Sequence, residues 1–180
     1  GLAKEADDAA RKSARLGYAR GLDRVVEAMA PTAYARHRIA ASTLPGAPAI
    51  AAFLESAEGF HLNANQVGAW VRAHPDASAP LLADPQAMRT LASLSRVARV
   101  ARRTEPALVL VRDGIGSARD IAASGPAAFA TRYGETFGSH TLALTAHAQA
   151  GAVALGAAEL LLEATAQPAN RIAVMPAGGA

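Results

Sequence analysis

The clearest structural signal in this chain is the stretch Asp84-Pro-Gln-Ala-Met-Arg-Thr-Leu-Ala-Ser-Leu-Ser-Arg-Val-Ala-Arg-Val100. Asp84 is a typical N-cap residue, because its carboxylate can accept the free N–H groups of a first helical turn. Pro85 suits that first turn, where its missing N–H costs nothing and its fixed φ is already helical. The pair predicts a long helix from Pro85 to about Arg103, and similar start and stop signals divide the rest of the chain.

The composition favours helices throughout. Of the 180 residues, 48 are alanine and only 44 carry a larger apolar side chain, namely Val, Ile, Leu, Met, Phe, Trp or Tyr. Alanine is the best helix former and a poor strand former, so this composition indicates closely packed helices. No segment alternates apolar and polar residues over a sustained length, as a half-buried strand would. We therefore predict an all-α fold, an irregular bundle of about seven to nine short and long helices joined by Gly and Pro turns, with no sheet.

Apolar spacing and punctuation residues predict where the helices lie. In the first helix, Leu22, Val25 and Met29 recur at steps of three and four residues. Ser117, followed by Asp120 three residues later, has the form of a capping box. The predicted helices cover residues 3–29, 32–41, 50 to about 59, a segment from an N-cap at Asn63 to just before Pro75, and then 85–103, 106–113, 118–123, 126–134 and 139–166.

The turn-rich connector Leu44-Pro-Gly-Ala-Pro48 is a candidate domain boundary. It predicts N-terminal helices over residues 1–43, a candidate separate subdomain, and a helical domain over residues 44–166. Residues 167–180 contain two prolines and end in Pro-Ala-Gly-Gly-Ala, so we predict a disordered tail.

Several functional classes are disfavoured by the residues present. The chain has no cysteine, which excludes thiolate nucleophiles and cysteine-based metal sites. It has no Gly-x-Ser-x-Gly elbow, no P-loop and no dinucleotide fingerprint. His37, His61, His74, His140 and His147 do not have metal-ligand spacing. We therefore expect no catalytic residue, no metal and no cofactor. The longest apolar stretch, residues 150–162, is too short to span a membrane. From the charged residues near the N-terminus we also expect no signal peptide.

Basic residues are concentrated in one part of the chain. Residues 86–132 hold eight Arg and three acidic residues, while residues 133–180 have a net charge of −2. On a helix, Arg89, Arg96, Arg99 and Arg103 fall within an arc of about 80° and form a stripe. Such a stripe can bind phosphate or an acidic protein surface, or it can be the solvated face of an amphipathic helix.

The segment from Val111 to Ala122 resembles a helix-hairpin-helix. The turn Gly114-Ile-Gly116 opens its second helix, and Arg112 and Arg119 flank the turn. In such a motif the N–H groups of the turn approach a phosphate, which makes nucleic-acid binding the alternative function. The same turn is also a simple way to join two short helices at a steep angle, because glycine allows positive φ.

Five blocks of the sequence, taken in order, resemble a known family. They are Phe60-His-Leu-Asn-Ala-Asn-Gln-Val-Gly-Ala-Trp70, Leu91-Ala-Ser-Leu-Ser-Arg-Val-Ala-Arg-Val100, Gly114-Ile-Gly-Ser-Ala-Arg-Asp-Ile-Ala122, Gly125-Pro-Ala-Ala-Phe-Ala-Thr-Arg-Tyr-Gly134, and an Ala-rich, His-bearing helix from Leu142. Together they look like the N-terminal helical region of the A component of bacterial tripartite (Tc) insecticidal toxins and related virulence-plasmid A proteins. The resemblance covers about residues 47–166.

The resemblance implies a structural and not a catalytic role. In that family the region contributes to the helical outer shell of a large homopentamer, which binds target cells and injects a toxic enzyme carried by other subunits. It implies an extracellular or bacterial-surface location, and other segments or subunits of the toxin complex as partners. It also assigns packing roles to Phe60, Leu62, Val67, Trp70, Leu91, Leu94, Ile115, Ile121, Phe129 and Tyr133.

Small residues are expected to matter at two kinds of position. Ala146, Ala150, Ala154 and Ala157 of the last helix would allow another helix to approach closely. Structural turns are expected at Gly114, Gly116, Gly125 and Gly134, and if Gly125 or Gly134 needs positive φ, valine there destabilises the fold.

Overall fold

The computed structural model describes the backbone of residues 2–166, and the side chains of that range except residues 2–10, 16 and 166. Ten helices lie in this range, and none of its residues forms a strand, which confirms the all-α class. The chain divides into two compact units, unit 1 up to Gly114 and unit 2 from Ile115 onward. The predicted disordered tail, residues 167–180, lies outside the described residues.

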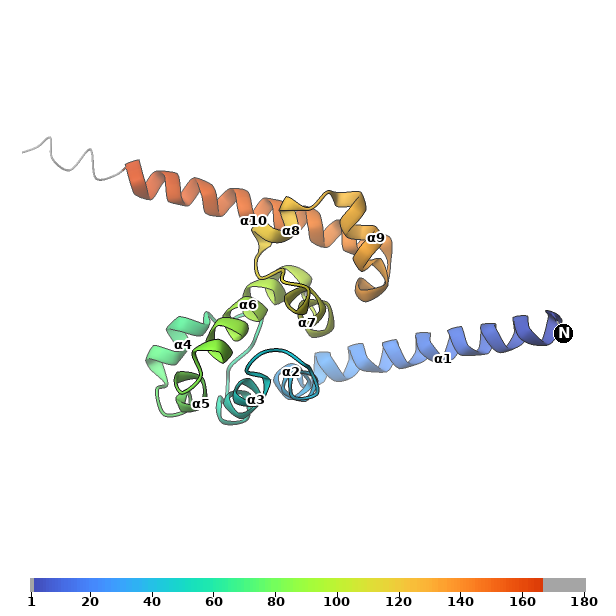
Figure 1. Cartoon of the computed structure of the whole chain (residues 1–180), viewed down its shortest axis with the longest axis horizontal. Helices are drawn as coiled ribbons and strands as arrows, with labels where there is room; N and C mark the ends of the chain where they lie inside the picture. Colours follow the sequence, from blue (N-terminus) through green and yellow to red (C-terminus); the bar gives the residue numbers. More distant parts are fainter. Residues whose placement is uncertain (1, 167–180) are drawn as a thin grey trace, which may run out of the picture. The chain divides into compact units, whose positions relative to one another are not determined.

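Unit 1 contains seven of these helices, shown from blue to green in Figure 1. They are α1 (Leu2–Met29), α2 (Pro31–Ala40), α3 (Ala47–Ser56), α4 (Val67–Ala73), α5 (Ala79–Leu82), α6 (Pro85–Ala101) and α7 (Thr104–Arg112). Unit 2 contains α8 (Ala118–Ala123), α9 (Pro126–Phe137) and α10 (His140–Ala166). The four-residue helix α5 is not among the predicted helices, although Pro80 lies in its first turn.

The start of α6 is formed as the sequence predicts. The Asp84 carboxylate accepts hydrogen bonds from the N–H groups of Gln86 at 2.9 Å and Ala87 at 3.1 Å. The end of this helix differs from the prediction, because α6 stops at Ala101 and not at Arg103. Arg102 adopts the left-handed conformation, with φ 56°, and reverses the chain before α7.

The core of unit 1 forms around the buried face of α6. Leu91, Leu94 and Val97 are fully buried there. The Phe60 ring lies edge-on to Phe53 and Trp70, with ring centroids 5.1 Å and 5.4 Å apart. Of the packing positions that the resemblance assigns to this unit, Phe60, Leu62, Val67, Leu91 and Leu94 are buried and Trp70 is half-buried.

Two sequence expectations fail in the first half of unit 1. Asn63 does not cap α4, whose N-cap residue is Gln66. The neighbouring Asn65 instead uses its side-chain oxygen to accept the N–H of His61 at 2.6 Å, so the asparagine signal belongs to a turn. Residue 43 does not divide the structure, because α2 and α3 pack against each other across it and the division falls at Gly114.

The core of unit 2 is a small aromatic cluster covered by alanines. Phe129 lies 4.9 Å from Tyr133 and 5.8 Å from Phe137, measured between ring centroids. On α10, Ala143, Ala146 and Ala150 are buried. Methyl side chains at this spacing let the first half of α10 lie close to α8 and α9. Ala154 is half-buried and Ala157 is exposed, so close packing stops before them.

The glycine turns of unit 2 differ from the prediction. Gly125 has φ −65°, and an added Cβ there would meet no atom within 4 Å. Gly134 does not end α9, which continues to Phe137, and Gly138 with φ 94° caps its end. A Cβ added at Gly134 would lie 3.4 Å from the backbone of His140 at the start of α10, which is at the edge of ordinary van der Waals contact.

Candidate interaction surfaces

Three of the four stripe arginines lie on the solvent side of α6. Arg89, Arg96 and Arg99 are exposed. Arg96 donates to the Ser93 hydroxyl at 3.0 Å, and Arg99 donates to the carbonyl of Asn65 at 2.8 Å. Arg103 does not continue the stripe, because the left-handed turn at Arg102 lies between it and α6. The stripe is therefore shorter than the helical spacing predicted.

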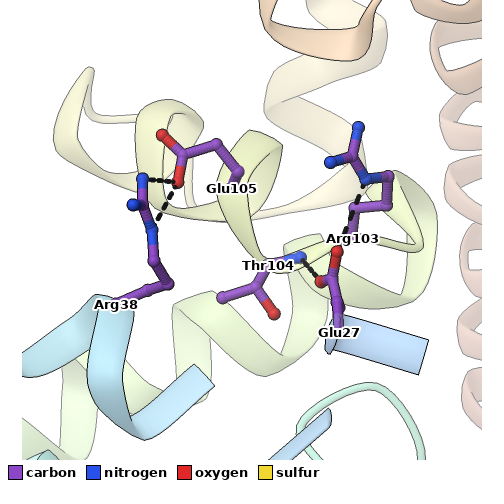
Figure 2. Close-up of polar contacts among 5 residues, drawn as sticks. All are labelled: Glu27, Arg38, Arg103, Thr104 and Glu105. Carbon is purple, nitrogen blue, oxygen red and sulfur yellow. Dashed lines mark hydrogen bonds and ion pairs between the residues drawn. The ribbon is translucent and has the colours of Figure 1, made fainter. Parts of the chain in front are cut away.

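Arg103 takes part in the contact that ties α1 to α7. Its Nε lies 3.4 Å from Oε2 of Glu27, and the other Glu27 oxygen accepts the N–H of Thr104, the first residue of α7 (Figure 2). Both side chains are mostly buried, with exposed fractions of 25% and 13%. Since Arg103 offers no side-chain cap itself, a carboxylate from α1 supplies the N-terminal cap of α7.

A second ion pair ties α2 to the same end of α7. The Arg38 guanidinium donates two hydrogen bonds to Oε2 of Glu105, one from Nε at 3.0 Å and one from Nη2 (Figure 2). Burial is the largest single influence on the pKa of Arg38 and lowers it, but the hydrogen bond to Glu105 and the negative charges of Glu105, Tyr34 and Asp23 together outweigh burial, so that pKa is raised. Burial raises the pKa of the neighbouring Tyr34, with a further contribution from the Asp23 carboxylate.

The predicted hairpin turn binds its own carboxylate. Gly114 has φ 85°, as a left-handed turn residue does, and Ser117 caps α8 by accepting the N–H of Asp120 at 3.2 Å. The Ser117 cap is thus confirmed, but the return bond differs from that of a capping box. The Asp120 carboxylate accepts the N–H of Gly116, not that of Ser117, at 3.0 Å, and this N–H is a donor that a phosphate would need.

The two arginines beside this turn belong to different units. Arg112, in the last turn of α7, lies 3.6 Å from the carboxylate of its neighbour Asp113. Arg119 is exposed on α8, a helix of six residues in unit 2.

The second half of α1 carries an uncovered apolar stripe. Tyr18, Leu22, Val25, Val26 and Met29 are between 48% and 81% exposed. At 3.6 residues per turn they fall within an arc of about 100°, which is the face that an amphipathic helix normally buries. The other helices of unit 1 do not cover this face, and Figure 1 shows α1 continuing beyond them.

The second half of α10 is apolar on most of its circumference. Leu155, Leu160, Leu161 and Leu162 are 67% to 70% exposed, and Val153 is 50% exposed. Consecutive helical residues are about 100° apart, so the three adjacent leucines face three different directions. A helix that is apolar nearly all round is normally buried by more than one neighbour.

A cavity that the sequence did not indicate lies in unit 1. Its volume is about 360 Å³, and its lining comes from α1, the loop after α3, and the junction of α6 and α7. We call it the basic cavity; its charged lining residues are Arg24, Glu27, Arg102 and Arg103. No sequence motif could have indicated it, because these residues become neighbours only when α1 packs on α7.

Two of the histidines make contacts with residues near them in the fold. His74 stacks on Trp70 with ring centroids 4.1 Å apart, and Nε2 of His147 lies 2.7 Å from the carbonyl of Ser124. Within the described range, histidine and carboxylate side chains do not gather in groups of three that could hold a metal ion. Residues 2–166 also include no helix with the length and apolar character needed to cross a membrane.

Comparison of the chain with models of protein families, with curated proteins and with solved structures gave no match.

Proposed function

We propose that this chain is a non-enzymatic shell and interaction segment of a toxin-complex A component, as its resemblance to the Tc family implies. Its work in this proposal is to pack against other helices of the same component. It would thereby contribute to an assembly that delivers a toxin to target cells.

One observation carries the proposal. Apolar residues of the ordered blocks pack inside the units: Leu91, Leu94, Ile121 and Phe129 are fully buried or nearly so, and Ile115 is half-buried. The first block supplies the Phe60 ring at the centre of the unit 1 aromatic contacts. A sequence selected for a shell would place its recognisable residues in such positions.

The uncovered helices supply the second line of support. The stripe on α1 and the outer half of α10 present apolar side chains that water does not stabilise. In this proposal both surfaces are covered by neighbouring helices of the A component. A stripe of about 100° needs one such neighbour, and the outer half of α10 needs at least two.

The test is the size and symmetry of the native gene product. An antibody raised against the purified chain would isolate that product from the organism that encodes it, and electron microscopy would give its symmetry. We expect a much longer polypeptide assembled as a homopentamer that binds target cells. A native product that is monomeric would overturn the proposal, as would an assembly in which this segment lies away from the outer surface.

A further inference from the structure

The basic cavity of unit 1 has an excess of positive charge. It is lined by three arginines and one carboxylate. The Glu27 carboxylate is taken up by Arg103 and by the N–H of Thr104 (Figure 2), so it neutralises only Arg103. The guanidinium groups of Arg24 and Arg102 have no hydrogen bond or ion pair with any described residue, and both side chains are exposed.

The uncharged part of the lining is mostly apolar. It is formed by Ala28, Pro31, Leu62 and Ala98, together with the polar residues Asn63 and Thr104, and Leu62 and Ala98 are buried. The volume of about 360 Å³ lies within the range of ordinary small-molecule sites. It is equivalent to about twelve water molecules in the liquid, which is more space than a bare oxyanion needs.

The backbone at Arg102 adds a separate observation. This residue has φ 56° and ends α6 in the left-handed conformation, where glycine or asparagine is the usual choice. Among the described residues no other non-glycine residue has positive φ. An arginine at this position costs stability, while its side chain contributes to the lining of the cavity.

We propose that the basic cavity binds a small organic oxyanion, a phosphate or carboxylate group attached to a compact apolar body. Arg24 and Arg102 each donate charge-assisted hydrogen bonds to the oxyanion, and the wall around Leu62 contacts the apolar body. The N-terminus of α7 is not part of this site, because Glu27 already caps it.

The binding test uses phenyl phosphate, benzoate and neutral benzyl alcohol as probes, with nuclear magnetic resonance of the ¹⁵N-labelled chain as the readout. We expect phenyl phosphate to bind with a Kd of about 1 mM or tighter. Benzoate should bind more weakly and benzyl alcohol not measurably, because the two free guanidinium groups attract charge. Affinity should fall as salt rises. Equal binding of the neutral alcohol and phenyl phosphate would overturn the proposal.

Variants locate the site and separate binding from folding. Arg24→Gln and Arg102→Gln should each weaken phenyl phosphate binding about tenfold, the usual effect of losing one charge-assisted hydrogen bond. Arg89→Gln is the matched control, since Arg89 is an exposed arginine of α6 that does not line the cavity. Unchanged affinity in both cavity variants, or an equal loss in the control, would contradict the proposal.

Arg102→Gly distinguishes a ligand-binding role from a structural one. Glycine relieves the left-handed strain, so Tm should rise by a few degrees, roughly 2–8 °C per kcal/mol for a chain of this size. The same variant should lose phenyl phosphate binding to the same extent as Arg102→Gln. A lower Tm together with wild-type affinity would show that the Arg102 side chain holds the fold and not a ligand.

Discussion

Gly46, the N-cap residue of α3, lies directly against Ala87 of α6. Its φ is 74°, and a Cβ built on it would lie 2.5 Å from the Cα of Ala87. Both the conformation and the space therefore require glycine. Because the obstructing atoms belong to backbone and to an alanine methyl, no flexible side chain can move aside.

We predict that Gly46→Ala destabilises the fold by about 2 kcal/mol or more, from left-handed strain and from separation of α3 and α6. Denaturant unfolding of the two proteins measures the difference. Gly125→Ala is the matched control and should change stability little, because Gly125 has φ −65° and open space around its Cα. A comparable loss in both variants would contradict the prediction.

The sequence alone does not show at which positions the fold requires glycine. The sequence predicts structural turns at Gly114, Gly116, Gly125 and Gly134, whereas positive φ occurs at Gly46, Gly59, Gly114 and Gly138, so Gly114 is the position the two sets share. Proline and glycine signals show where a helix is interrupted. They do not show which backbone passes nearby, and at Gly46 the obstructing neighbour, Ala87, comes from another helix.

The stability of the fold at alkaline pH depends on whether the Tyr34 hydroxyl keeps its proton. Burial raises its pKa above the ordinary value of 10.0, so the folded chain holds this proton more tightly than the unfolded chain. The resulting stability is complete below pH 10 and is lost as pH rises through the folded-state pKa. Stability should therefore fall on the alkaline side.

We predict that Tyr34→Phe removes part of this alkaline loss, because phenylalanine has no proton to release. Thermal unfolding at pH values on both sides of 10 measures the loss in each protein. Tyr18→Phe is the control, since the Tyr18 ring is 71% exposed, and it should behave as the wild type does. The same alkaline loss in Tyr34→Phe and wild type would contradict this assignment.

At the scale of elements, the start of α7 depends on a residue 77 positions earlier in the chain. The helices before and after it in the sequence, α6 and α8, are capped locally by Asp84 and Ser117, and the sequence predicted both caps. The cap of α7 comes from Glu27, which in the sequence is one more charge on a mixed helix. A local motif can reveal a local cap, but a tertiary cap becomes visible only when α1 is packed in place.

We predict that Glu27→Ala destabilises unit 1 by about 1–3 kcal/mol, because the Thr104 N–H and the mostly buried Arg103 both lose their acceptor. Glu55→Ala is the matched control. Glu55 also pairs with an arginine, Arg36, at 3.0 Å, but its side chain is 72% exposed, so its loss should cost little. Urea unfolding gives both values, and equal costs would show that Glu27 is no more than a surface pair.

At the scale of the whole molecule, the outer half of α10 is a helix whose apolar side chains are left exposed. The sequence predicted this helix correctly, and Ala146 and Ala150 of its predicted alanine face are covered, but Ala154 is only half-buried and Ala157 is exposed. The leucines after Gly151 are more apolar than these alanines and yet are exposed. Periodicity identifies a helix face, but the number of neighbours depends on what else is present to cover it.

We predict that the isolated chain self-associates through these leucines, and that Leu161→Lys reduces the association without lowering Tm. The Leu161 side chain is 67% exposed, so a lysine there should change the stability of the single chain by no more than about 0.5 kcal/mol. In an associated form the same lysine would have to bury its charge, which is costly. Sedimentation velocity over a range of concentrations measures the association, with Thr141→Lys, an exposed position in the first turn of α10, as the control. A wild-type chain that stays monomeric at high concentration would show that these leucines tolerate water. The argument from α10 to a shell role would then fail, while the core of each unit would be unaffected.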